Sequence, residues 1–195
     1  IAKHFVATDP DASVLILTGS PMLHAFRIPP RIDYVKLPCL ARTREGQYTV
    51  KFLSLHYQDT VRLRANLILS TVLDFQPDLI LIDKKPMGVG NELTPTLEML
   101  QRRSARSKVV LLLRDILDSP EATAGVWKKN GYFEAIEAYY DMVLVVGTPE
   151  IFDVRTEYDF PPACADKVRY CGYIARERSI KTRAAVRDAF AAGDE

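Results

Sequence analysis

Four short apolar runs constrain the fold of this chain more than any other feature of its sequence. None of them alternates apolar with polar residues, so we expect both faces of each run to be buried. That is typical of central strands in a parallel sheet, because helices cover both faces of such a sheet. The runs cover residues 14–18 (VLILT), 79–83 (LILID), 109–114 (VVLLLR) and 142–147 (MVLVVG).

Helical patterns alternate with these runs. Apolar residues recur at helical spacing over residues 58–75 and 92–103, and residues 120–140 predict two short helices separated by an Asn-Gly turn. Weaker strands are predicted at 33–37 and 168–171. The later strand ends lie about thirty residues apart, the length of one βαβ unit. The sequence therefore predicts an α/β fold with a doubly wound, mainly parallel, Rossmann-like sheet and right-handed crossovers.

The two ends of the chain differ in character from its middle. Residues 1–6 follow helical spacing without a capping residue before them, and Asp9-Pro10-Asp11 ends the pattern. We therefore expect the natural polypeptide to extend upstream. Residues 175–195 predict a polar helix with a thin apolar stripe, either a linker or an element that packs on a neighbour. The expected division is a domain over 1–174 and a linker or helix over 175–195.

Composition excludes several classes of protein. The 26 Lys and Arg balance 25 Asp and Glu, which gives no electrostatic footprint for nucleic acid. Three widely spaced cysteines indicate neither a zinc site nor a disulfide framework. No apolar run approaches the roughly 20 residues that span a bilayer, and no signal peptide opens the chain. These features predict a cytoplasmic protein without a transmembrane segment, and no metal or cofactor motif is present.

Polar residues follow the apolar runs at the points where the strands should end. In open α/β sheets, ligands bind outside the carboxyl ends of the strands. We expect the ends at residues 18–21, 83–86, 114–118 and 147–149 to share one edge. Carboxylates accept hydrogen bonds from hydroxyls, while Lys and Arg hold hydroxyls or phosphate. The candidate substrate-binding residues are Asp83, Lys84, Lys85, Arg114 and Asp115.

A structural interpretation stands beside this functional one. The same residues can be ordinary loop starts and helix caps, and Asp118 is a plausible N-cap for the helix that follows. The loop over residues 88–92 (GVGNE) precedes a helix, so its amides could hold an anion, or its glycines could serve only as a flexible helix entry.

Several of these segments resemble one family in their order and spacing. The resemblance covers residues 1 to about 175, and the family comprises bacterial predicted glycosyltransferases related to the MurG group, which have the GT-B, family 28-like architecture. The matching segments are DPDASVLILTGSP from Asp9, DYVKLP from Asp33, DKKPMG from Asp83, LRDILD from Leu113, YYD from Tyr139, GTPEIFD from Gly147 and YCGY from Tyr170.

The resemblance implies that this chain is the amino-side, acceptor-binding half of a two-domain enzyme. Such an enzyme moves a sugar from a nucleotide-sugar donor to a hydroxyl acceptor, and the donor would bind to a second domain following residue 195. The chain would lack the first strand of the family and its Gly-rich loop, which leaves the catalytic residues unknown. A lipid-linked acceptor would bring the protein to the inner face of the membrane, and the fragment alone would be inactive.

Two other functions remain open at this point. A nucleotide-sugar 2-epimerase-like enzyme shares the two-domain plan, and the downstream sequence would distinguish it from a transferase. The second alternative is a non-catalytic, flavodoxin-like binding module, such as one that holds a sugar without reacting with it.

Overall fold

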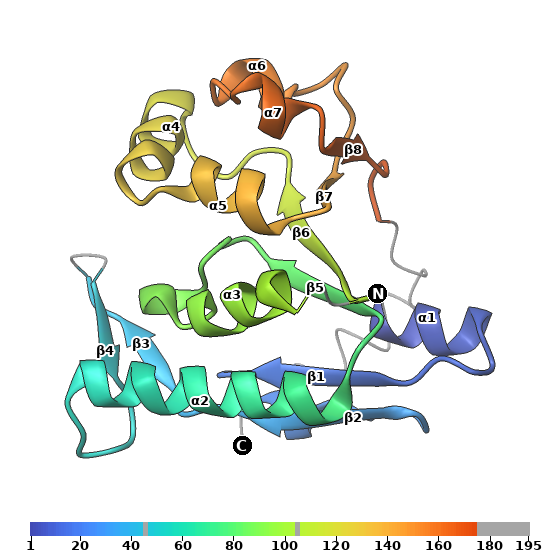
Figure 1. Ribbon diagram of the computed structural model, residues 1–195, viewed down its shortest axis with the longest axis vertical. Helices are drawn as coiled ribbons and strands as arrows, with labels where there is room; N and C mark the ends of the chain where they lie inside the picture. The colour runs from blue at the N-terminus through green and yellow to red at the C-terminus, as the bar shows by residue number, and fades with distance from the viewer. Residues whose placement is uncertain (45–46, 104–105, 175–195) are drawn as a thin grey trace, which may run out of the picture.

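The computed structural model describes residues 1–44, 47–103 and 106–174, and over these residues the chain has an α/β architecture (Figure 1). A four-stranded sheet has the order β5-β6-β7-β8, and all its neighbouring strands run parallel. A separate parallel pair joins β1 to β2, and β3 and β4 form an antiparallel hairpin. The strands are β1 (Val14–Thr18), β2 (Ile32–Lys36), β3 (Leu40–Arg42), β4 (Tyr48–Val50), β5 (Leu79–Asp83), β6 (Lys108–Arg114), β7 (Met142–Val146) and β8 (Val168–Tyr170).

The helices lie close to the positions that the apolar spacing predicts. The predicted break between two short helices is confirmed, because Gly131 takes a left-handed backbone (φ 64°) between α4 and α5. The helices are α1 (Ala2–Thr8), α2 (Tyr57–Phe75), α3 (Thr94–Arg102), α4 (Pro120–Lys129), α5 (Tyr132–Tyr139), α6 (Val154–Glu157) and α7 (Pro162–Ala165), with 3₁₀ turns η1 (Leu23–Ala25) and η2 (Val89–Asn91).

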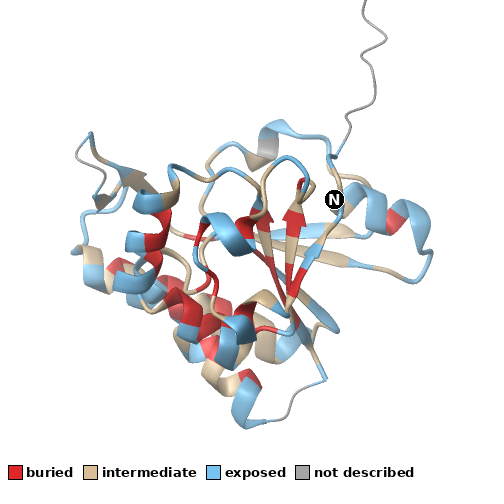
Figure 2. Ribbon diagram, turned by 90° about the horizontal axis from the view of Figure 1, so that it is seen from above, coloured by how far each residue is buried: buried red, intermediate tan, exposed pale blue. Residues whose placement is uncertain are grey.

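One face of the four-stranded sheet carries the main core. Helices α3, α4 and α5 all lie on the same side of β5–β8 in Figure 1, and Figure 2 shows buried residues concentrated in these strands and helices. The ring of Trp127 packs against Phe133 and Phe160, with centroids 5.5 and 5.4 Å apart. The strand residues that face this cluster are Ile82, Leu111, Leu113, Val143, Val145 and Val168.

The opposite face departs from the prediction that both faces of every run are buried. On β5, Leu79 is 42% exposed and Leu81 is 36% exposed. Within the described residues, β5 is the edge strand of its sheet, so these side chains have strand neighbours on one side only.

The sequence predicts one sheet, whereas the described part of the chain forms two parallel sheets. Strand β1 pairs with β2 alone, so its carboxyl end belongs to a different sheet from the ends of β5, β6 and β7. An apolar run predicts that a strand is buried, but it does not determine which strand lies beside it.

Two smaller features also differ from expectation, and one prediction concerns residues that the structure does not describe. The β3–β4 hairpin was not predicted, because its strands of three residues are too short to show a pattern. The N-cap of α4 is Ser119, whose hydroxyl accepts from the Ala122 amide at 3.3 Å, and not Asp118 as predicted. The linker or helix expected over 175–195 lies outside the described residues.

Candidate functional site

The carboxyl ends of β5, β6 and β7 meet at one edge, which we call the rim (residues 83–85, 114–118 and 147–149). The register places Asp83 opposite Leu112 on β6, and Arg114 opposite Val146 on β7. Because all three strands run parallel, the polar residues at their carboxyl ends emerge together, which confirms the prediction for three of the four strand ends. The fourth, at residues 18–21, follows β1 and belongs to the other parallel sheet. Asp83, Lys84 and Arg114 are exposed there, whereas Asp115 is half-buried.

The two lysines that follow β5 do not act together. Lys84 has a left-handed backbone (φ 65°), which costs a non-glycine residue about 1–2 kcal/mol, and its N–H donates to the Leu112 carbonyl at 2.9 Å. Lys85 points to the hairpin instead, where its Nζ lies 4.4 Å from the centre of the Tyr48 ring. Lys84 therefore stays at the rim in solvent, while Lys85 makes a cation–π contact with β4.

Asp115 is the most tightly positioned of the five candidates. Its Oδ1 accepts from the Ile116 amide at 2.8 Å, and its Oδ2 accepts from the Tyr173 hydroxyl at 2.5 Å. This hydrogen bond to Asp115 raises the pKa of Tyr173 above its ordinary value. Gly147 lies so close that a Cβ built on it would stand 2.7 Å from the Asp115 Cβ. The carboxylate therefore has a fixed orientation, and a side chain at Gly147, which directly follows β7, would require Asp115 to shift.

A buried tyrosine, which no sequence pattern indicates, holds the loop after β6 through its hydroxyl group. The Tyr158 hydroxyl accepts from the Leu117 amide at 2.8 Å and donates to the Asp115 carbonyl at 3.1 Å. Tyr158 itself is fully buried beneath the rim. No sequence signal identifies it, because its partners lie about forty positions away and are main-chain atoms.

The second unpredicted feature is a buried ion pair at the entry to α3. Arg64 of α2 is 6% exposed and Glu92 is 5% exposed. The guanidinium donates from Nε to one Glu92 oxygen and from Nη2 to the other at 2.7 Å, and its Nη1 donates to the Pro38 carbonyl at 2.5 Å. The Val89 amide also donates to Glu92, at 3.4 Å. The anion at this loop is therefore the chain's own carboxylate, so the structural interpretation of residues 88–92 fits better than an external anion.

The Arg64–Glu92 pair also connects the two parallel sheets. The Arg64 Nη1 lies 2.7 Å from where a Cβ on Gly19 would stand, and Gly19 directly follows the residues of β1. The Gly19 carbonyl accepts from the Cys39 thiol at 2.8 Å. The loop after β1 is thus packed against the same ion pair that anchors the loop after β5.

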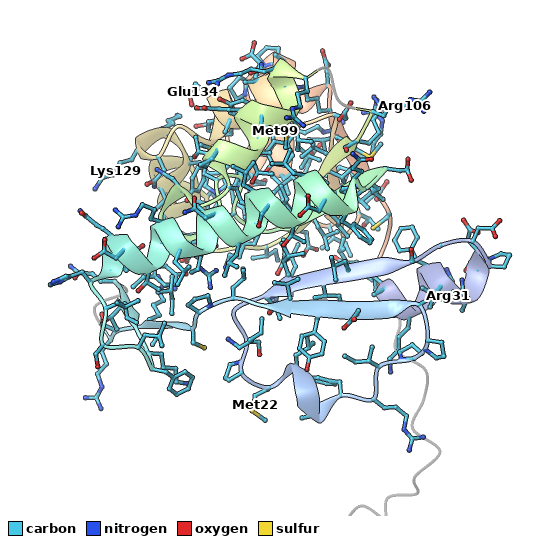
Figure 3. The ribbon with its side chains drawn as sticks, turned by 60° about the horizontal axis from the view of Figure 1, so that its bottom comes forward. Met22, Arg31, Met99, Arg106, Lys129 and Glu134 are labelled. Carbon is cyan, nitrogen blue, oxygen red and sulfur yellow. The ribbon has the colours of Figure 1, made fainter. Side chains whose placement is uncertain are left out.

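An open hollow of about 610 Å³ lies elsewhere, between α1 and residues 27–31. The guanidinium of Arg31, labelled in Figure 3, donates to the main-chain carbonyls of Val6, Asp9, Pro10 and Ala12. It thereby satisfies carbonyl groups at the end of α1 and in the turn that follows. Because Arg31 is committed to these carbonyls and the hollow lies near the start of β2, we assign the candidate site to the rim.

Among the described residues, no group of three or more His, Cys, Asp or Glu side chains could hold a metal ion. Over the same residues, no helix is long and apolar enough to cross a membrane. The candidate residues Asp83 and Asp115 supply carboxylates, and Arg114 and Lys84 supply a guanidinium and an ammonium group. Together these groups can donate hydrogen bonds to a polyhydroxyl ligand and accept them from it.

Comparisons with known proteins add no functional assignment to these residues. No family model matches the chain, no curated protein matches it, and no solved structure matches it.

Proposed function

We propose that this chain is the acceptor-side domain of a glycosyltransferase, and that a hydroxyl acceptor binds at the rim. One observation carries the proposal: Asp83, Lys84, Arg114 and Asp115 end or directly follow neighbouring parallel strands, at the same carboxyl ends of the sheet. Ligands of open α/β sheets bind at such an edge.

The rim offers the contacts that an acceptor needs. The carboxylates of Asp83 and Asp115 would accept hydrogen bonds from acceptor hydroxyls, and Lys84 and Arg114 would donate to ring or phosphate oxygens. Lys85 contributes less, because its ammonium group lies over Tyr48. Removing the proton of the acceptor hydroxyl and stabilising the leaving diphosphate would require groups of the donor-binding domain or of the Gly-rich loop that the resemblance implies.

A binding module without catalysis is the second candidate. It requires only the hydrogen-bonding groups of the rim, and no group that removes a proton from the ligand. Both candidates require a ligand at the rim, so one binding experiment tests their shared part.

The experiment is an NMR titration of the ¹⁵N-labelled 195-residue chain with methyl glycosides of glucose and N-acetylglucosamine, and separately with UDP-N-acetylglucosamine. We expect the glycosides to shift rim amides and the nucleotide sugar to shift none. Arg114→Gln and Asp115→Asn should each weaken glycoside binding about tenfold, since each removes a charge-assisted hydrogen bond.

Lys108→Gln is the matched control. Lys108 starts the same strand that Arg114 ends, so it lies at the amino ends of the strands, away from the rim. If the glycosides shifted only amides at the amino ends of the strands, or shifted no amides, the proposal would be overturned. Tight binding of the nucleotide sugar by this chain alone would refute the acceptor-side assignment. In a polypeptide that also carries a donor-binding domain, rim substitutions that lower kcat/KM would favour the transferase over the binding module.

A further inference from the structure

We propose that the hydroxyl acceptor is a pyranose sugar, and that it stacks on the ring of Tyr173, which follows β8. The inference rests on the proposed function and deepens it, because it names the kind of acceptor and a further residue that binds it. Three observations carry it: the turn that brings Tyr173 to the rim, the hydrogen bond between its hydroxyl and Asp115, and the exposure of its ring.

The main chain that leaves β8 stays beside β7, its neighbour in the sheet (Figure 1). The Cys171 amide donates to the Val145 carbonyl at 3.0 Å. The next amide, that of Gly172, donates to the Gly147 carbonyl at 3.1 Å. Gly172 has a left-handed backbone (φ 71°), and a Cβ built on it would meet nothing within 4 Å, so this glycine provides the turn and not space. The backbone is therefore fixed to the carboxyl end of β7 up to the residue before Tyr173.

The side chain of Tyr173 is held at its polar end, although the residue is 54% exposed. Its hydroxyl donates to Asp115 Oδ2 at 2.5 Å, and the other oxygen of that carboxylate accepts from the Ile116 amide at 2.8 Å. The backbone turn fixes one end of the side chain and the carboxylate fixes the other. The ring therefore keeps one orientation in solvent, beside the rim.

The hydrogen bonds of this pair decide what a ligand must offer. The bond to Asp115 raises the pKa of Tyr173, so at neutral pH the hydroxyl keeps its proton and directs it to the carboxylate. A hydroxyl oxygen and a carboxylate oxygen each have two lone pairs, so both oxygens can still accept from a ligand. The Tyr173–Asp115 pair therefore favours a ligand that donates hydrogen bonds, as the hydroxyls of a sugar do.

The exposed ring adds a requirement that hydroxyls alone do not meet. The face of an aromatic ring is electrostatically negative, and it attracts the weakly positive C–H groups of a ligand. A pyranose with equatorial hydroxyls has C–H bonds on both faces and hydroxyls around its edge. It can therefore lie flat on Tyr173 while its edge hydroxyls reach Asp115. A tyrosine gives such contact at a small cost in conformational entropy, because it has only two side-chain torsions. A flexible polyol has the hydroxyls but no rigid C–H face.

Variants of Tyr173 separate the ring from the hydroxyl. The experiment is an NMR titration of the ¹⁵N-labelled 195-residue chain with methyl β-D-glucopyranoside, followed at the rim amides. Tyr173→Ala should weaken binding about tenfold, which is the upper end of what a ring contact contributes. Tyr173→Phe should weaken it less than about threefold, because the ring remains and only an exposed hydrogen bond is lost.

Two controls accompany these variants. Phe75 is an aromatic residue of similar exposure (43%) that ends α2 and precedes the amino end of β5, so Phe75→Ala should leave binding unchanged. The acyclic polyol D-glucitol is the ligand control. The wild-type chain should bind it more weakly than the glycoside, whereas the Tyr173→Ala variant should bind the two alike.

A direct readout of stacking is the nuclear Overhauser effect from the Tyr173 ring to the bound glycoside. Successive ring carbons of this sugar carry axial hydrogens on opposite faces, so only the hydrogens of one face should respond. A response from both faces, or from neither, would overturn the inference.

The variants distinguish failure of this inference from failure of the proposed function. Equal losses in Tyr173→Ala and Tyr173→Phe would mean that Tyr173 only orients Asp115, which would overturn the stacking. Unchanged glycoside binding in Tyr173→Ala, with weaker binding in Arg114→Gln and Asp115→Asn, would also overturn the stacking but leave the rim as the binding site. If no glycoside bound to the chain, both proposals would fall.

Discussion

Arg64→Met should destabilise the fold more than any substitution of an exposed ion-pair residue in this chain. It removes both hydrogen bonds to Glu92 and the one to the Pro38 carbonyl, and it leaves a carboxylate that is 5% exposed with the Val89 amide at 3.4 Å. Removing one partner of a buried pair costs about 3–5 kcal/mol, because the remaining charge is desolvated without compensation. We expect a loss in that range in the free energy of unfolding.

Urea denaturation followed by circular dichroism measures this loss. Glu92→Leu should cost a similar amount of stability. The double variant Arg64→Met with Glu92→Leu should be more stable than the sum of the two single losses predicts, by at least about 2 kcal/mol, because neither charge is then left unpaired. Unchanged m-values would show that the loss of stability does not come from a change in the unfolded state.

An exposed pair of the same chemistry is the control. Arg102 and Glu98 lie one turn apart on α3 with an N–O distance of 3.1 Å, and their side chains are largely exposed. Arg102→Met should cost less than about 0.5 kcal/mol, because solvent already screens the pair. If Arg64→Met cost no more than this control, or if the double variant were strictly additive, the assignment of Arg64–Glu92 as the link between the two sheets would be wrong.

Three further predictions concern the rim and the α6 region. Gly147→Ala should displace Asp115, because the new Cβ would stand 2.7 Å from the Asp115 Cβ; we expect a loss of about 1–3 kcal/mol in stability, measured by urea unfolding, with amide shifts around residue 115. Tyr158→Phe should cost about 1–3 kcal/mol in the same assay, since it leaves a half-buried amide of the loop after β6 without its acceptor. The hydrogen bond from Arg155 to Asp153 is the main reason that the pKa of Asp153 falls from its ordinary value to about 2, so Asp153 contributes stability above pH 4 that is lost as the pH falls toward 2. Asp153→Asn should therefore flatten the dependence of Tm on pH between about 4 and 2, measured by thermal denaturation.

Each of these predictions has a result that contradicts it. Gly125→Ala is the control for Gly147→Ala, because a Cβ at Gly125 meets nothing within 4 Å, so equal losses at both positions would exclude the crowding argument. A stable Tyr158→Phe variant would mean that the loop finds another acceptor. An unchanged acid profile in Asp153→Asn would mean that other carboxyl groups govern acid unfolding in this range.

Local sequence patterns predict the positions of some rim residues, but not of all of them. Parallel strands with polar residues at their ends place Asp83, Arg114 and Asp115 at one edge, and the structure confirms that placement. Their role in binding stays a prediction. Lys85 differs, because its direction depends on Tyr48 of a hairpin whose strands are too short to predict.

The sequence by itself determined the longer helices and the apolar strands, but not the β3–β4 hairpin. Apolar spacing over residues 58–75 and uninterrupted apolar runs encode local periodicity and burial, and the Asn130-Gly131 turn separates α4 from α5. Only the tertiary structure decided that β1 pairs with β2 alone, and that Arg64 meets Glu92 across 28 positions of the chain. The physical reason is that a local pattern indicates how much of a segment is buried. The neighbour of that segment is selected by packing and hydrogen bonding among residues far apart in sequence.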